Sequence, residues 1–310
     1  MSETPISQEA IYRARPTLRF NGAEDLRASE LILAMRMEEH EGGMSRLELR
    51  LSNVASTTDG RAELAFGANS NVRLGGAIEV YAGDEAEPRE IFRGQITAIE
   101  ADFRSGAPPE LVVLAEDALA RARMARRSRT YADMSPAAVT RAIAGELGVR
   151  PVITGLESPV GTWAQVNESD LSFLRRLLGR FDADLQFVGD ELHVSPRADV
   201  RRGAIELALY SQLARARVIA DLSHQVTRST ARGWSAADGA AVEGTASRGT
   251  HLGPGQGRDG ASVLREAPDE RSEHIGHVAV STQDEAQAVA AAAYDLRARR
   301  FVTVEGSAEG

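Results

Sequence analysis

Apolar and polar residues alternate along the first third of the chain, with the two-residue period of half-buried β-strands. Leu47, Leu49 and Leu51 show it most clearly, because charged residues separate them. The runs with this pattern are 16–21, 44–53, 77–82 and 90–103. The alternation slips within 95–100, which predicts a β-bulge there. Gly and Asn/Asp clusters separate the runs, so this region is predicted to be a barrel or sandwich.

Helical spacing replaces the alternation after residue 117. The Arg- and Ala-rich segment 117–129 predicts a short helix that leaves the first domain. Ser135 followed by Pro136 predicts a helix start, since a hydroxyl N-cap and proline at the first helical position suit one another. The apolar positions that follow at helical spacing are Val139, Ile143 and Leu147, and Gly148 is predicted to end this helix.

A second helix is predicted to open at Asn167, with Asp170 completing its cap. Its predicted core face consists of Leu171, Leu174, Leu177, Leu178 and Phe181. Two strands, 185–188 and 191–194, follow and are joined by Gly189 and Asp190, which is typical of a compact hairpin. Residues 130–196 are therefore predicted to form a helix–helix–hairpin module.

The remaining residues return to a β pattern. Strands are predicted around 217–219 and 224–230, and the segment 233–260, rich in Gly, Ala and Ser, predicts a long mobile loop. Thr282 and Glu285 predict the cap of a last helix, whose expected apolar stripe is Ala286, Val289, Ala290, Ala293 and Leu296. A strand then begins at Phe301 without a following partner, so we expect part of this domain to lie beyond the sequence.

These patterns together predict an α+β fold that is mainly β. Two β regions, of which the first has the turn-separated strands of a barrel or sandwich, flank a small α/β module. The expected boundaries are 1–129 for the first domain with its exit helix, 130–196 for the module, and 197–310 for the second domain with its Gly-rich loop, 233–260, and its C-terminal helix. A chain of 310 residues is long enough for this organisation.

Composition narrows the classes of function. The chain has no cysteine and its basic residues are all arginine, which excludes disulfides, thiolate catalysis, Schiff-base chemistry and a phosphate-loop lysine. The net charge of −9 argues against general nucleic-acid binding. The sequence contains neither a signal-peptide pattern nor an apolar run of membrane-spanning length. We therefore expect a protein made in the cytoplasm without a signal peptide and without membrane insertion.

Few residues suggest a catalytic, metal-binding or phosphate-binding site. The glycines around Gly253 lie in the predicted loop without the strand and helix that a phosphate site needs. His274 and His277 have Gly276 between them and lack a recognised ligand spacing, so no metal or cofactor is expected. Acidic pairs such as Glu38 with Glu39, and Asp182 with Asp184, leave open an enzyme that uses carboxylates.

One concentrated basic feature stands out, formed by Arg121, Arg123, Arg126, Arg127 and Arg129. Three interpretations remain open. The first is a solvated helix face that balances nearby acids. The second is a patch that docks onto an acidic protein surface, with nucleic acid as a third, weaker possibility.

One segment is specific enough to suggest a family. The sequence QVNESDLSFLRRLLGRFDADLQFVGDELHV, residues 165–194, resembles the signature of the phage late control protein D and VgrG family. The preceding TYADMSPAAVTRAIAGELGV and the C-terminal HVAVSTQDEAQAVAAAAYDLRARRFVTVEGSAEG are similar to flanking parts of the same family. The resemblance covers most of 120–232 and 272–310, whereas the first domain fits in pattern only.

The resemblance implies a structural hub at the baseplate centre of a contractile phage tail or injection machine. It also implies two β-barrel-like domains per chain, joined by the small α/β module. Three chains would form a homotrimer that joins the hexameric tail tube to a trimeric spike, with baseplate wedge components as further partners. The chain departs from VgrG because it lacks a needle extension, so the spike would be a separate polypeptide. The alternative is a tail-associated enzyme that degrades peptidoglycan through acidic residues.

Overall fold

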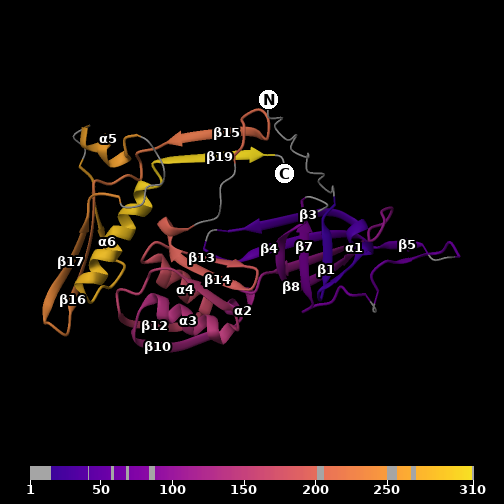
Figure 1. Ribbon diagram of the computed structural model, residues 1–310, viewed down its shortest axis with the longest axis horizontal. Helices are drawn as coiled ribbons and strands as arrows, with labels where there is room; N and C mark the ends of the chain where they lie inside the picture. Colours follow the sequence, from indigo (N-terminus) through magenta and orange to yellow (C-terminus); the bar gives the residue numbers. More distant parts are fainter. Residues whose placement is uncertain are drawn as a thin grey trace, which may run out of the picture. The chain divides into compact units, whose positions relative to one another are not determined.

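The computed structural model describes residues 15–40, 42–56, 59–67, 70–83, 88–200, 206–249, 257–266 and 270–308. The chain divides into two compact units (Figure 1). The first consists of Met1–Met124 with Gln186–Glu191, and the second of Ala125–Leu185 with Leu192–Gly310.

A seven-stranded sheet dominates the first unit, in the order β2-β1-β7-β8-β9-β4-β3. Its strands are β1 (Thr17–Phe20), β2 (Ala23–Glu24), β3 (Ile32–Glu39), β4 (Ser45–Ser52), β7 (Ala77–Ala82), β8 (Arg89–Asp102) and β9 (Glu110–Glu116). Neighbouring strands are antiparallel. A small pair, β5 (Val54–Ser56) with β6 (Ala62–Leu64), and the short helices α1 (Leu26–Glu30) and α2 (Ala120–Met124) complete the unit.

The alternating pattern produces the core of this sheet. Leu47, Leu49 and Leu51 on β4 are almost completely buried, while the intervening side chains face outward or lie half-buried. The predicted bulge in β8 is confirmed, because its pairing with β9 shifts register between Ile96 and Ala98. In the described pairing the end strands β2 and β3 do not bond to each other, so the sheet does not close into a barrel.

The second unit begins with the predicted helix–helix–hairpin module, apart from the hairpin tip Gln186–Glu191, which belongs to the first unit. The structure adds strands to this module. Its elements are β10 (Arg126–Met134), α3 (Pro136–Leu147), β11 (Arg150–Ile153), β12 (Gly161–Ser169), α4 (Asp170–Gly179), β13 (Ala183–Val188) and β14 (Glu191–Pro196), followed by the short 3-10 turn η1 (Arg197–Asp199). The Ser135 hydroxyl caps α3 by accepting from the Ala138 amide, and Gly148 ends it with a φ of 68°. Both ends of α3 therefore form where the sequence predicted them.

The second helix starts later than predicted. Its N-cap is Ser169, whose hydroxyl accepts the amide hydrogen of Ser172, and Asn167 lies in strand β12 instead. The hydroxyl reaches the amide three residues ahead, so Ser169 supplies the cap that the sequence analysis assigned to Asn167. The predicted leucines of α4 are buried, whereas Phe181 and, on α3, Leu147 are half-buried.

The rest of the second unit contains two small sheets and two helices. Strand β15 (Leu213–Ala220) pairs with β19 (Val302–Ala308), so the strand predicted from Phe301 has a partner far back in the sequence. A three-stranded sheet in the order β17-β16-β18 contains β16 (Arg228–Ser235), β17 (Ala240–Ala246) and β18 (Ser272–Ile275). The helices are α5 (Gly260–Glu266) and α6 (Gln283–Ala298).

The prediction of a long loop at 233–260 is wrong for the described residues 233–249. Residues up to Ser235 belong to β16, and Ala240–Ala246 form β17. The glycines serve close packing, because a Cβ on Gly244 would lie 2.1 Å from the carbonyl oxygen of Ala286 in α6. A Cβ on Gly233 would lie 1.9 Å from the carbonyl oxygen of Val280. Residues 250–256, which include Gly253, lie outside the described residues.

Helix α6 covers β17 and also satisfies its outer backbone edge. Thr282 caps the helix as predicted, and the helix buries Ala286, Val289 and Ala290, while Leu296 is exposed. The side-chain amide of Gln283 donates to the Glu243 carbonyl oxygen, 2.6 Å away, and accepts from the Glu243 amide. Gln287 binds the backbone of Thr245 in the same way.

The fold is α+β and mainly β, as predicted. The two predicted barrels are not closed in the part of the chain that the structure describes, where the sheets have two, three or seven strands in open order. Open sheets therefore replace the closed architecture that the turn-separated strands suggested.

Candidate functional site

Three of the five predicted interaction residues lie on a strand and not on a helix. Arg126, Arg127 and Arg129 belong to β10, which pairs with β12 in antiparallel register from Arg126 opposite Ser169 to Met134 opposite Gly161. The predicted exit helix is correct only for α2, which ends at Met124. Backbone pairing with β12 therefore overrides the helical propensity of this Arg- and Ala-rich segment.

The other two arginines lie in the first unit, on α2. Arg123 forms an ion pair with Glu116 at the end of β9, and Arg121 is exposed. The five arginines are thus divided between two units, and the site with the richest described geometry is the one around β10.

A buried carboxylate lies at the centre of that site. Asp170 is the first residue of α4, and its side chain is only 4% exposed. Gln165 on β12 donates to its Oδ1 atom at 2.9 Å. Arg127 Nε lies 3.3 Å from Oδ2, and Arg129 Nη2 lies 3.6 Å from Oδ1. Burial of a carboxylate requires such partners, so Asp170 fixes two β10 arginines against the start of α4.

The same two arginines extend the network to helix α3. Arg127 Nη1 lies 3.3 Å from Glu146 Oε2, and Arg129 forms an ion pair with the other oxygen of Glu146. The hydrogen bond from Arg129 lowers the pKa of Glu146, and the bond to Glu146 in turn raises the pKa of Arg129. Both groups therefore stay charged at neutral pH, and they connect α3, β10 and α4.

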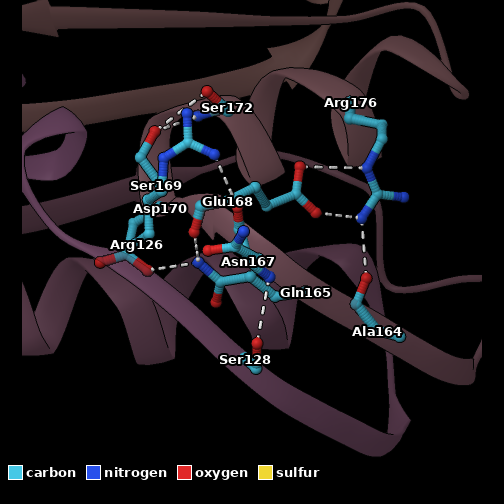
Figure 2. A network of polar contacts seen from close by, with 10 residues as sticks. All are labelled: Arg126, Ser128, Ala164, Gln165, Asn167, Glu168, Ser169, Asp170, Ser172 and Arg176. Atoms are coloured by element: carbon cyan, nitrogen blue, oxygen red, sulfur yellow. Dashed lines mark hydrogen bonds and ion pairs between the residues drawn. The ribbon is translucent and has the colours of Figure 1, made fainter.

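A second set of contacts holds the end of β12, as Figure 2 shows. Arg126 donates to the backbone carbonyl oxygen of Asn167 at 3.0 Å, and the backbone amide of Asn167 donates to the Ser128 hydroxyl at 3.0 Å. Asn167 has a φ of 46°, a left-handed conformation that asparagine tolerates better than most residues. These bonds set the turn from which Ser169 caps α4.

Glu168 and Arg176 form the outer part of the network in Figure 2. Arg176 Nη2 lies 2.6 Å from Glu168 Oε1 and also donates to the Ala164 carbonyl oxygen at 2.7 Å. The Arg176 guanidinium lies over the Phe173 ring at 5.3 Å, and Phe173 stacks on Tyr131 at 5.4 Å. Desolvation by burial raises the pKa of the Tyr131 phenol.

This arrangement positions backbone and side chains but presents no nucleophile beside a base. Asp170 and Glu146 balance the charges of Arg127 and Arg129, and Arg127 still leaves 42% of its side chain exposed. The site is therefore suited to hold a shaped surface rigidly. The sequence predicted Asp170 as part of a helix cap and showed the arginines only as a concentrated basic segment. The spacing of Arg127, Arg129 and Tyr131 at every second position was the available sign of a strand.

The other candidates of the sequence analysis lie apart from this network. His274 belongs to β18, and among the described residues no group of three or more possible metal ligands comes together. Asp182 forms ion pairs with Arg197 and Arg299, and Glu38 with Arg36 and Arg46. Along the described chain, no helix has the length and apolar character needed to cross a membrane.

Comparison with known proteins places this geometry in context. Residues 55–308 match the family described as the Alg8 N-terminal domain. Among curated proteins, none matches the chain.

Two tail proteins are among the solved structures that share the fold. The 43 kDa tail protein of prophage MuSo2 from Shewanella oneidensis has a TM-score of 0.63 and 13% identity, over 96% of this chain and 82% of that one. A tail protein from Neisseria meningitidis MC58 has a TM-score of 0.55 and 12% identity, over 88% of this chain and 73% of that one.

Proposed function

This chain belongs to the Alg8 N-terminal domain family, and we propose that it is the structural hub at the baseplate centre of a contractile, phage-tail-like injection machine. The observation that carries the proposal is the fold shared with the MuSo2 tail protein along 96% of this chain. The motif resemblance of residues 165–194 to late control protein D and VgrG proteins supports the same role.

In this role the protein is a homotrimer that joins the hexameric tail tube to a trimeric spike and contacts baseplate wedge components. It works through interfaces and not through catalysis, and it is incorporated in a phage tail or extracellular injection particle. Residues 1–129 and 197–310 supply the two β domains of each subunit, and 130–196 joins them. Paired β domains in three copies present near-sixfold symmetry to the tube and threefold symmetry to the spike.

The network around Asp170 supports this proposal because it holds Arg127 and Arg129 in fixed positions against the joining module. Arginine suits interface ion pairs, since its planar guanidinium binds carboxylates in two-point contacts. Arg121, Arg123, Arg126, Arg127 and Arg129 are the proposed contributors to contacts with acidic partner surfaces. Arg127 illustrates the arrangement, because Asp170 orients it while part of its side chain remains exposed.

The test is a measurement of mass for the full chain, alone and with its spike protein. We expect a trimer in at least one of the two conditions. A monomer in both conditions would contradict the hub. Leu74→Glu, at a side chain that is 66% exposed on the first unit, controls for non-specific effects of surface charge and should leave the mass unchanged.

A further inference from the structure

A hollow of about 490 Å³ lies within the second unit, where the module meets the three-stranded sheet. Trp163 on β12 and Arg180, which follows α4, line one side of it. The end of β16 with Trp234 and the segment 279–285 line the other side. This volume is within the range of pockets that bind ligands, and both tryptophans of the chain contribute to the lining.

Arg180 is the cation of this hollow, and its side chain is only 16% exposed. Its guanidinium lies 5.3 Å from the centre of the Trp163 ring, which meets Phe181 edge-on with 5.9 Å between ring centres. Nη2 forms an ion pair with Glu285 and donates to the Ala279 carbonyl oxygen at 2.7 Å. Nε is buried without a partner among the described residues, so Nη1 is the nitrogen left to meet a ligand.

The two acceptor groups that Arg180 contacts are already satisfied. Glu285 pairs with Arg180 through Oε1, and its Oε2 accepts from the Ser281 backbone amide at 2.8 Å and from the Ser281 hydroxyl at 3.1 Å. Donors remain, because the Thr162 hydroxyl and the Trp234 indole N–H also line the hollow. Neither of these two groups has a hydrogen-bond partner in the part of the chain that the structure describes.

Donors around a partly desolvated arginine favour a carboxylate, because an ionised carboxylate accepts hydrogen bonds and donates none. Burial lowers the pKa of Arg180, and the Glu285 carboxylate acts in the opposite direction. A second carboxylate would offset the desolvation of the guanidinium further. Hydrogen bonds between charged groups are also about twice as strong as those between neutral groups, so Nη1 selects an anionic oxygen over a neutral one.

Trp234 supplies an apolar wall beside this cation. It is 60% exposed, and it follows Gly233, where a Cβ would lie 1.9 Å from the Val280 carbonyl oxygen. That close approach fixes the end of β16 against the segment 279–281, so Trp234 stays beside the hollow. Exposed tryptophans carry much of the binding energy at protein contacts, and aromatic-lined grooves bind extended peptides through proline and other apolar side chains.

We propose that this hollow binds an extended segment of a partner protein, in which Asp or Glu stands beside a proline or a large apolar residue. The carboxylate binds Arg180, and the neighbouring apolar side chain packs on Trp234. A hollow of about 490 Å³ with an aromatic wall offers more contact than a lone carboxylate uses, which favours a peptide over a small anion. The site lies within a single chain, so it goes beyond the proposed function and does not depend on the proposed trimer.

Tryptophan fluorescence of the full chain reports on this site directly, because both tryptophans line the hollow. The probes are short peptides with blocked termini, in which a single Glu is flanked by Pro, Leu or Phe, and a matched set in which Gln replaces Glu. We expect a saturable change in fluorescence with at least one Glu peptide, and binding of its Gln counterpart that is weaker by about 10-fold or more. Equal binding of the two, or no response to any peptide, would overturn the proposal.

Two variants locate the bound peptide, with affinity measured by calorimetry. Trp234→Ala should leave the circular dichroism spectrum unchanged, since the side chain is largely exposed, and should weaken binding by about 10-fold or more. Arg180→Lys keeps a positive charge beside Glu285 but removes the free guanidinium nitrogen, so it should weaken the Glu peptide more than the Gln peptide. Tyr210→Ala, at an aromatic side chain that is 89% exposed outside the hollow, is the matched control and should bind normally. Unchanged affinity in Trp234→Ala would overturn the site.

Acetate distinguishes a peptide site from a site for any small anion. At the same concentration as the Glu peptide, acetate should displace almost none of it, whereas displacement as effective as that by the peptide itself would overturn the partner segment. The oligomeric state does not enter these measurements. A chain that is monomeric with and without its spike protein but binds the Glu peptide would contradict the hub and leave this site standing.

Discussion

Leu174 is completely buried on the inner face of α4, where leucine truncation leaves a cavity. We expect Leu174→Ala to lower the free energy of unfolding by about 2–5 kcal/mol, the range for buried leucines. Denaturant unfolding followed by circular dichroism measures the change. Leu296→Ala on α6 is the control, because that side chain is 42% exposed and should cost much less. Equal losses for the two variants would contradict the assigned core.

An ion pair between Glu273 on β18 and Arg297 joins the three-stranded sheet to the end of α6. Arg297 binds this carboxylate through Nε at 3.0 Å and Nη2 at 2.5 Å, and this hydrogen bonding lowers the pKa of Glu273. The stabilisation is therefore present above the ordinary value of 4.5 and is lost as the pH falls through the lower folded value.

We expect Glu273→Gln to reduce the free energy of unfolding at pH 7 by about 0.5–1 kcal/mol, since the pair is partly exposed. Below the folded pKa the two proteins should become equally stable, because Glu273 is then neutral. Urea titrations at several pH values measure the difference. A difference that persists unchanged at low pH would mean that the ion pair is not its cause.

At the scale of elements, the contact between β17 and α6 depends on Gly244. A methyl group there meets the Ala286 carbonyl oxygen at 2.1 Å, so the helix must move away from the sheet. We expect Gly244→Ala to destabilise the protein by about 1–3 kcal/mol, as overpacking does. Gly145→Ala on α3 meets nothing within 4 Å and should be neutral or slightly stabilising. Thermal unfolding compares the two variants.

The elements that sequence predicts well are those with a local cause. Ser135, Gly148 and Thr282 set helix ends through bonds to residues only a few positions away, and all three were predicted. Strand β4 was equally clear, because the alternation around Leu49 depends only on one buried face.

The remaining elements depend on contacts between distant segments. Composition around Gly244 indicates flexibility, whereas its function is to admit α6, which lies some forty residues later. The site shows the same limit. The sequence predicted Arg127 and Arg129 as interaction residues from their charge alone. Their partners Glu146 and Asp170 come within reach only because β10 pairs with β12.

At the scale of the whole molecule, an assay on peptidoglycan distinguishes the proposed structural role from the alternative of a peptidoglycan-degrading enzyme. We expect no release of glycan fragments when the purified chain is incubated with peptidoglycan, because at least one member of each acidic pair noted in the sequence forms ion pairs with arginines. Asp182 contacts Arg197 and Arg299 in this way. Product analysis by chromatography measures release, with a known muramidase as positive control. Release that disappears in Asp182→Asn would support the enzyme instead.

The ion pairs described above use only arginine as the cation, and this determines how the stability of the fold changes at alkaline pH. In every ion pair described above the cation is a guanidinium, which keeps its proton beyond about pH 12, whereas lysine pairs would already weaken near 10. The first groups to respond are then the phenols. Burial raises the pKa of Tyr131 and Tyr294 above the ordinary value of 10.0. Above about pH 10 these phenols ionise in the unfolded chain but stay neutral in the folded one. The folded state therefore loses stability as the pH rises from about 10 toward the folded pKa values. Alkaline denaturation should therefore begin near pH 10, with the absorbance change of tyrosinate, and before any salt bridge loses its charge.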